Sequence, residues 1–455
     1  MYHNEWPGNP TNDPLDEWNR TNLGTVFGLT LDDAGDIFVT ASSCYRVDLY
    51  PTVHGPGTGG EIYRIDGQTG KISLLTGSLP NSGQGLGNIT YDGVYDQFFV
   101  SNMDDGLIYR ISGDGTFLGA VRYDHGVTGR AAVGLSTIPD NNSPDFTPLG
   151  RRVWAVEMWT DMGNVNKSSR LVYSVWWEDF ARRNANEANE IWSVGINQTT
   201  GDFDLNDIRR EIIALPPISS ANGGWSSPVS DISFKPDGRI LLAERSMDAD
   251  DHPTAHWSRL LQYSCPLSSE WERDLNTQTG KDVFLVAREE KSTAGGVDVG
   301  FGDYFPVIFC PIGRVWASAD GLHQEIILGE PWVYGLGGLP YDGGNTNDDN
   351  PFTCIYIDLD LEYTLHVKWE MGDVEIPCPP WGCCRIAGDA NHDGKYNISD
   401  ITFGIARIFA GGERPQCDDE INANGDNSFN IADVTYGIAR IFAGGKAPVC
   451  GKTGT

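Results

Sequence analysis

A twelve-residue acidic loop that occurs twice near the C-terminal end is the feature that most constrains what this chain folds into. The two copies read DANHDGKYNISD at residues 389–400 and NANGDNSFNIAD at residues 422–433, so they lie 33 residues apart. Oxygen-bearing side chains recur at positions 1, 3, 5, 9 and 12 of both loops. Calcium is a hard cation that takes oxygen ligands, and this spacing is that of an EF-hand-type calcium loop.

The spacing predicts a calcium ligand set in each loop, with a backbone carbonyl at position 7. In the first loop the set is Asp389, Asn391, Asp393, the carbonyl of Lys395, Asn397 and Asp400. In the second loop it is Asn422, Asn424, Asp426, the carbonyl of Ser428, Asn430 and Asp433. The second loop begins with a neutral asparagine and has fewer negative charges, so we expect it to bind calcium more weakly.

A short helix is expected after each loop, in ITFGIARIFAGG at 401–412 and in VTYGIARIFAGG at 434–445. Apolar residues recur in both at the i, i+4, i+7, i+8 spacing of one helix face. The stripes are Ile401, Ile405, Ile408 and Phe409 in the first helix and Val434, Ile438, Ile441 and Phe442 in the second. We expect the two stripes to pack against each other, and the glycine pair after each helix to end it.

A duplicated calcium loop, with one helix after each copy and none before it, resembles the type I dockerin domain. The resemblance covers about residues 384–450 and implies an extracellular module that plugs into a cohesin-like protein. Dockerins commonly carry hydroxyl residues at loop positions 10 and 11 and basic residues in the helix. Here those loop positions hold Ile398–Ser399 and Ile431–Ala432, whereas Arg407 and Arg440 match the basic positions approximately.

Cysteines cluster around this small domain, and the chain has nine in all. Clustering beside a small domain indicates disulfide bonds and an oxidising compartment. The candidates are Cys378, Cys383, Cys384, Cys417 and Cys450. A pairing of Cys450 with Cys383 or Cys384 would join the two ends of the domain, and zinc binding is the alternative use of the cluster.

The larger N-terminal part repeats a pattern of short apolar strands joined by turns such as PDG and DDG. The repeat recurs every roughly 40–65 residues, the scale of a four-stranded propeller blade. We therefore predict a mainly β chain, with a β-propeller of six blades, or seven, followed by the small helical domain. A β-sandwich array is the alternative. The expected boundaries are an arm at 1–20, the propeller at 21–377, a Cys/Pro linker at 378–387 and the dockerin-like domain at 388–455.

The blade rhythm is similar to that of the NHL and gluconolactonase-like six-bladed propellers. That group includes calcium-dependent lactonases, which place Glu, Asn and Asp on a central metal, and non-catalytic binding proteins. The resemblance implies tunnel-lining candidates on the first strand of several blades, and these are Asn88, Glu157, Asp231 and Asp298. The alternative is a polar, water-filled tunnel without a metal. Glu244 and Arg245 are expected to form a buried ion pair at the end of a blade.

The net charge of −31 and the pI near 4.4 argue against binding to nucleic acid or to anionic membranes. No apolar run is long enough for a membrane span. We therefore expect an extracellular or cell-surface protein that binds Ca²⁺.

Two classes of function fit these features. The first is a non-catalytic scaffold whose dockerin-like tail mediates calcium-dependent assembly, either with copies of itself into a filament or tube or with a cohesin-like partner. The second is a secreted propeller hydrolase, active on lactones or glycans and carried by a dockerin. The sequence shows no nucleophile–base pattern and no nucleophile elbow, which favours the non-catalytic reading.

Overall fold

The computed structural model describes most of the chain. The described residues are 18–42, 51–122, 151–160, 169–177, 188–216, 227–301, 312–322, 334–346, 354–358, 371–376, 387–412, 415 and 418–449, with shorter gaps at 33, 68, 78, 82–84, 236, 250–251, 254–256, 266–269, 288–289, 392–394 and 427. Two compact units are distinguished, Met1–Phe305 with Pro311–Ile376 and Pro306–Cys310 with Pro377–Thr455. Each unit is described by itself.

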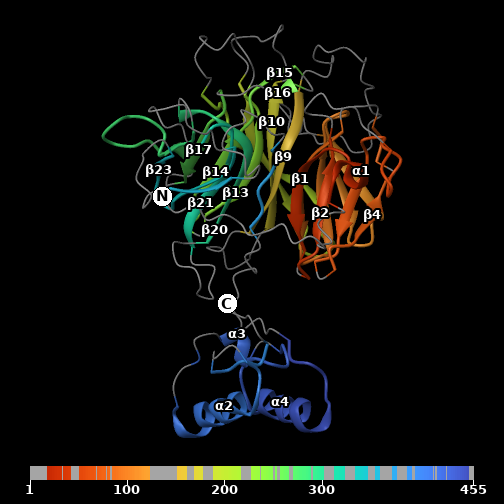
Figure 1. The fold of residues 1–455 in the computed structure, drawn as a ribbon, viewed down its shortest axis with the longest axis vertical. Coiled ribbons are helices and arrows are strands. Elements are labelled where there is room, and N and C mark those ends of the chain that lie inside the picture. Colours follow the sequence, from red (N-terminus) through yellow and green to blue (C-terminus); the bar gives the residue numbers. More distant parts are fainter. Residues whose placement is uncertain are drawn as a thin grey trace. The chain divides into compact units, whose positions relative to one another are not determined.

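The first unit is a β-propeller built from five four-stranded antiparallel sheets, each a meander of strands (Figure 1). Blade 1 holds β1 (Val26–Leu31), β2 (Ile37–Ala41), β3 (Ile62–Ile65) and β4 (Ile72–Thr76). Blade 2 holds β5 (Leu86–Asp92), β6 (Gln97–Asn102), β7 (Leu107–Ser112) and β8 (Phe117–Arg122). Blade 3 holds β9 (Arg151–Thr160), β10 (Ser169–Trp177), β11 (Glu190–Ile196) and β12 (Phe203–Ile212).

The last two blades follow the same order. Blade 4 holds β13 (Val229–Phe234), β14 (Ile240–Glu244), β17 (Leu260–Ser264) and β18 (Glu272–Arg273). Blade 5 holds β20 (Thr293–Phe301), β21 (Ile312–Ala319), β22 (Gly335–Pro340) and β24 (Ile355–Asp358). Outside the blades lie α1 (Arg20–Leu23) and the short pairs β15 (Met247–Ala249) with β16 (His252–Pro253) and β19 (Phe284–Leu285) with β23 (Gly344–Asn345).

The prediction of six blades is wrong, because the described residues form five. The stretch GLGGLP at 335–340 resembles the first-strand sequence GLGNIT, and this resemblance raises the predicted number of blades. It is instead β22, the third strand of blade 5, paired with β21 on one side and β24 on the other. A Cβ atom at Gly338 would lie 2.9 Å from the Trp316 ring, so this strand needs glycine to pass the tryptophan. Packing inside a blade, and not a new blade, accounts for the glycines.

The hydrophobic core lies between neighbouring blades. Phe99 and Ile108 of blade 2 pack with Leu171 and Val194 of blade 3. Blades 4 and 5 share another cluster, which includes Leu241, Leu260, Val297, Val315 and Leu339. Burial of apolar side chains between the faces of neighbouring sheets stabilises the propeller.

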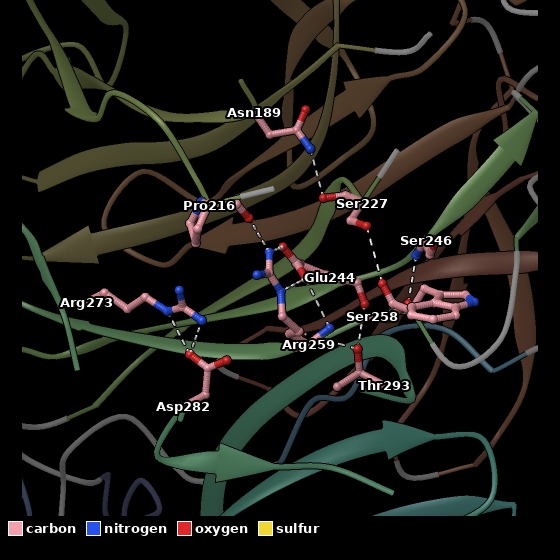
Figure 2. Close-up of polar contacts among 11 residues, drawn as sticks. Asn189, Pro216, Ser227, Glu244, Ser246, Ser258, Arg259, Arg273, Asp282 and Thr293 are labelled. Atoms are coloured by element: carbon pink, nitrogen blue, oxygen red, sulfur yellow. Dashed lines mark hydrogen bonds and ion pairs between the residues drawn. The ribbon is translucent and has the colours of Figure 1, made fainter. Parts of the chain in front are cut away.

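The buried charges of blade 4 do not pair as predicted. Glu244 pairs with Arg259, which directly precedes the adjacent strand β17, and Arg245 pairs with Asp320 at 3.1 Å. Figure 2 shows the Arg259 guanidinium directed at Glu244, with an Nη2–O distance of 2.6 Å to the carbonyl of Pro216. Neighbouring residues in a strand point to opposite faces, so Glu244 and Arg245 find separate partners.

The second unit contains α2 (Ile398–Ala410), α3 (Asp418–Ile421) and α4 (Ile431–Ala443). Asn397 and Asn430 cap the starts of α2 and α4, each with a complete capping box. Gly411 and Gly444 end them in the left-handed conformation, at φ of 64° and 66°. Both helices therefore end at the predicted glycine pairs, but each begins three residues before the predicted range, inside its calcium loop.

The packing of the two helices differs from the prediction. Ile401 and Val434 are buried and Ile408 and Ile441 are partly buried, but the remaining stripe residues are exposed, namely Ile405, Phe409, Ile438 and Phe442. A Cβ atom at Gly437 would lie 2.4 Å from Ile401, and one at Gly404 would lie 3.3 Å from Val434. The helices thus pack closely at the two glycines, and the contact is too local to cover the rest of either stripe.

Candidate functional sites: the calcium loops and the propeller centre

The first calcium loop places two of its predicted ligands in the interior of the C-terminal unit. Asp389 and Asp400 are buried, and the exposed Lys395 side chain leaves its carbonyl as the predicted ligand. The Asp400 carboxylate accepts hydrogen bonds from the backbone N–H groups of Asn391 (3.2 Å) and Asn397 (2.7 Å), and these bonds hold the carboxylate against the loop. Asp393 lies outside the described residues.

The second loop repeats this geometry one repeat further on. The Asp433 carboxylate accepts the N–H groups of Asn424 (3.1 Å) and Asn430 (2.9 Å). Asp426 accepts the N–H of Ser428 at 3.1 Å. The two loops therefore share one backbone arrangement, which the sequence spacing predicts.

Asn422 supports a cation in the second loop. Its side chain is fully buried, and neither its oxygen nor its nitrogen has a hydrogen-bond partner among the described residues. Leaving a buried amide unpaired costs about 1–3 kcal/mol, and a metal ion bound at position 1 would satisfy its oxygen. The residues present thus fit Ca²⁺, which would be held by Asn422, Asn424, Asp426, the Ser428 carbonyl, Asn430 and Asp433.

Each long helix of this unit exposes the same three apolar side chains. Ile398 and Ile431 are 48% and 47% exposed, Ile405 and Ile438 39% and 38%, and Phe409 and Phe442 69% and 70%. We call these two sets the α2 face and the α4 face; Figure 1 shows the two helices side by side. Because the exposed fractions of matching residues are nearly identical, the unit presents the same apolar surface on both helices.

The two arginines that the resemblance predicts for partner binding also act within their own helices. Arg407 donates to the carbonyl of Gly412 at 3.2 Å, and Arg440 donates to the carbonyl of Gly445 at 3.1 Å. Cations at the C-terminal ends of helices offset the negative end of the helix dipole. Both side chains remain exposed, and the helical spacing places them on the side of each helix opposite to the α2 and α4 faces.

The four tunnel candidates all lie on the first strands of blades 2 to 5. The Asn88 amide donates to Asp231 at 3.0 Å, which links blade 2 to blade 4. Glu157 accepts from Thr90 at 2.9 Å, and Asp298 accepts from Ser233 at 2.9 Å. These candidates share the propeller centre, although they fall into two groups.

Sequence reasoning missed two further carboxyl groups, Asp373 and Glu375, in the segment 371–376. Asp373 hydrogen-bonds with Asn88 and Asp231, and these three form the Asp231 group. Glu375 lies near Glu157 and Asp298, and these three form the Glu157 group. A local pattern marks four of the six: Asn88, Asp231, Asp298 and Asp373 each precede Ile or Val and accept that residue's N–H.

The carboxyl groups of the propeller centre have raised pKa values. Burial, opposed by the hydrogen bond from Thr90 and assisted by nearby carboxylates, raises the pKa of Glu157 to about 8. Burial raises the pKa of Asp298 to about 6. Burial also raises the pKa values of Asp231 and Glu375 well above the ordinary range. Part of Glu157, Asp298 and Glu375 remains accessible to water, so these groups can exchange protons.

The arrangement of these carboxyl groups does not by itself make a metal site. Within the described ranges, no three His, Cys, Asp or Glu side chains are grouped as metal ligands. Several oxygens already accept backbone N–H groups, as Asp231 does from Val297 at 2.6 Å. The centre is therefore a set of carboxyl groups that are held by hydrogen bonds to backbone and side chains of several blades.

The predicted disulfide candidates Cys378, Cys383, Cys384, Cys417 and Cys450 lie outside the described residues. Of the cysteines that the structure does describe, Cys265 is exposed and Cys354 is buried. No helix in the described part of the chain is long and apolar enough to cross a membrane.

Solved structures share the propeller fold with this chain. It is similar to a nidogen/laminin complex (11% identity, 70% of this chain and 76% of that chain, TM-score 0.32) and to a luciferin-regenerating enzyme (10%, 74% and 77%, 0.36). It is also similar to a calcium-binding protein, regucalcin, from Agrobacterium tumefaciens str. C58 (13%, 72% and 74%, 0.31). At these values the likeness concerns the fold alone, which the strand order already shows.

No protein-family model matches the sequence, and no curated protein matches it.

Proposed function

We propose that this chain is an extracellular calcium-binding interaction protein, in which the propeller serves as a scaffold and the C-terminal unit docks on a partner protein. The observation that carries the proposal is the duplicated apolar surface of the α2 and α4 faces. Six large apolar side chains on two helices remain exposed in a small unit. Exposed apolar patches of this kind are typical of protein–protein contact sites.

The side chains of the two faces indicate which groups the partner's surface must carry. Loop position 10, where dockerins commonly carry a hydroxyl residue, holds Ile398 in one repeat and Ile431 in the other. A complementary surface is therefore apolar at that point. Arg407 and Arg440 lie on the other side of each helix and offer a separate contact for acidic groups, which a second copy of this chain, with its net charge of −31, has the charge to supply. A second copy and a cohesin-like protein are the two partners that fit.

Serine substitutions at the two exposed phenylalanines test the proposal. Phe409→Ser or Phe442→Ser alone leaves one complete face, so we expect the affinity to fall by no more than about twofold. The double variant removes an anchor from each face and should bind at least about 100-fold more weakly. Sedimentation velocity in millimolar calcium measures self-association, and an immobilised cohesin domain measures the other partner. Val94→Ser, at a propeller residue that is 72% exposed, is the matched control.

Two outcomes would contradict docking through the helix faces. One is a double variant that associates as the unmodified chain does. The other is loss of binding in the Val94→Ser control to the same extent as in the double variant.

The carboxyl groups of the propeller centre favour a second candidate function, hydrolysis. Glu157 and Asp298 have different raised pKa values, about 8 and about 6, and such a pair can serve as general acid and general base. The substrate would be a lactone or a glycan. Turnover of a lactone and glycoside panel that disappears in Glu157→Gln would support this candidate, and the absence of any turnover would remove it.

A further inference from the structure

The segment 371–376 fills the gap between blade 5 and blade 1. On one side, a Cβ atom at Gly372 would lie 2.8 Å from the carbonyl oxygen of Phe27 in β1. On the other side, a Cβ atom at Gly296 of β20 would lie 2.4 Å from the carbonyl oxygen of Gly372. Backbone thus meets backbone on both sides, and glycine is required at each contact.

Hydrogen bonds attach this segment to the two blades. The Leu29 N–H donates to Asp373 Oδ2 at 2.9 Å, and the Asp373 N–H donates to the Phe27 carbonyl at 3.2 Å, which joins it to β1. Toward blade 5, the Ile376 N–H donates to Asp298 Oδ2 at 2.7 Å. The Ser318 hydroxyl donates to the Gly372 carbonyl at 2.8 Å. Carboxylates therefore supply two of these four attachments.

The apolar contact of this segment is small compared with that between other blades. Among the described residues, Met371 packs in a cluster with only Ala294 and Tyr334. The contact between blades 2 and 3, by comparison, holds eleven buried apolar residues. Besides Met371, only Val374 of this segment is a buried apolar residue. Apolar burial is the main stabilising contribution at each contact between blades, so the described residues hold the segment 371–376 less firmly than they hold a blade.

We propose that residues 371–376 form a detachable clasp, which closes the propeller between blades 5 and 1 and opens before any blade unfolds. Opening separates Asp373 from Asn88 and Asp231. It also separates Glu375 from Glu157 and Asp298. The clasp therefore controls whether the Asp231 group and the Glu157 group are complete. The C-terminal unit begins directly after Ile376.

Hydrogen–deuterium exchange of the full-length chain tests the clasp, followed by mass spectrometry of its peptides. In the unmodified chain, peptides covering 371–376 should exchange faster than peptides from β10 and β11. Asp373→Ala removes the carboxylate that holds Leu29 and should speed exchange in β1 and the clasp by about tenfold or more. Exchange in β10 and β11 should stay unchanged. Ser318→Ala is the milder variant and should give the same pattern with a smaller change.

A matched control removes a different buried aspartate. Asp92 accepts from Gln97 at 2.9 Å within blade 2, so Asp92→Ala should speed exchange in blade 2 and leave the clasp unchanged. Exchange that rises equally in every blade with Asp373→Ala would overturn the proposal, because the ring would then open only by global unfolding. If Asp373→Ala does not fold, Ser318→Ala decides, and unchanged exchange of the clasp in that variant overturns the proposal.

Discussion

Replacing Asp389 and Asp400 together by alanine is expected to unfold the C-terminal unit and to leave the propeller folded. The described part of this unit buries few apolar side chains, namely Ala390, Ile401, Ile421, Ala423 and Val434. So small a core does not stabilise a domain by itself. A calcium site with micromolar affinity adds about 4 kcal/mol at millimolar calcium, and Asp400 also completes the capping box of α2. The double variant loses both contributions.

Circular dichroism and calorimetry of the full chain, with and without calcium, measure this effect. The unmodified chain should show a calcium-dependent transition that the double variant lacks, while the propeller transition stays in place in both. Lys395→Ala is the matched control, because that position is predicted to contribute its carbonyl and its side chain is exposed. A double variant that keeps the calcium-dependent transition would show that these loops do not hold the metal.

The propeller is expected to lose stability as the pH rises from 5 to 9. In the folded chain the pKa of Glu157 is about 8 and that of Asp298 is about 6, whereas unfolded glutamate and aspartate titrate near pH 4. The folded state therefore holds more protons than the unfolded state above about pH 4. Stability then falls with rising pH until the folded pKa of about 8 is passed. The expected loss is on the order of a few kcal/mol.

Thermal melts across this pH range compare the unmodified chain with Glu157→Gln. The glutamine keeps an oxygen for Thr90 but cannot ionise, so the variant should show a shallower fall in the propeller Tm. Equal slopes in the two proteins would mean that Glu157 does not carry the raised pKa assigned to it.

The sequence predicts the calcium loops and their helices because ligand spacing and capping are local. Asn397 caps α2 and Gly411 ends it at positions readable from a few neighbouring residues. The exposed helix faces are different, because they depend on where α2 and α4 meet. Only the tertiary structure shows that contact at Gly404 and Gly437 leaves Phe409 and Phe442 uncovered.

The propeller shows the same division between local and long-range information. The apolar strands can be recognised in the sequence, whereas the number of blades depends on which strands pair. The sequence of β22 resembles a first strand, but its pairing makes it the third strand of blade 5. Asp373 was missed because its role comes from contacts with residues such as Leu29, which lies 344 positions away. The shared Asp-Val pattern of Asp298 and Asp373 was a usable local signal, but it identifies the position only once the first strands are aligned.

Light scattering of the full chain through one cycle of chelation and calcium return tests the central claim most directly. Chelation should unfold the C-terminal unit, so that the α2 and α4 faces are lost. It should also restore the repulsion between chains of net charge −31. Large particles, or a complex with a cohesin domain, should therefore dissociate on chelation and re-form with calcium, and magnesium should substitute poorly. Particles that stay monomeric throughout the cycle, with no partner retained on the calcium-loaded chain, would contradict the account.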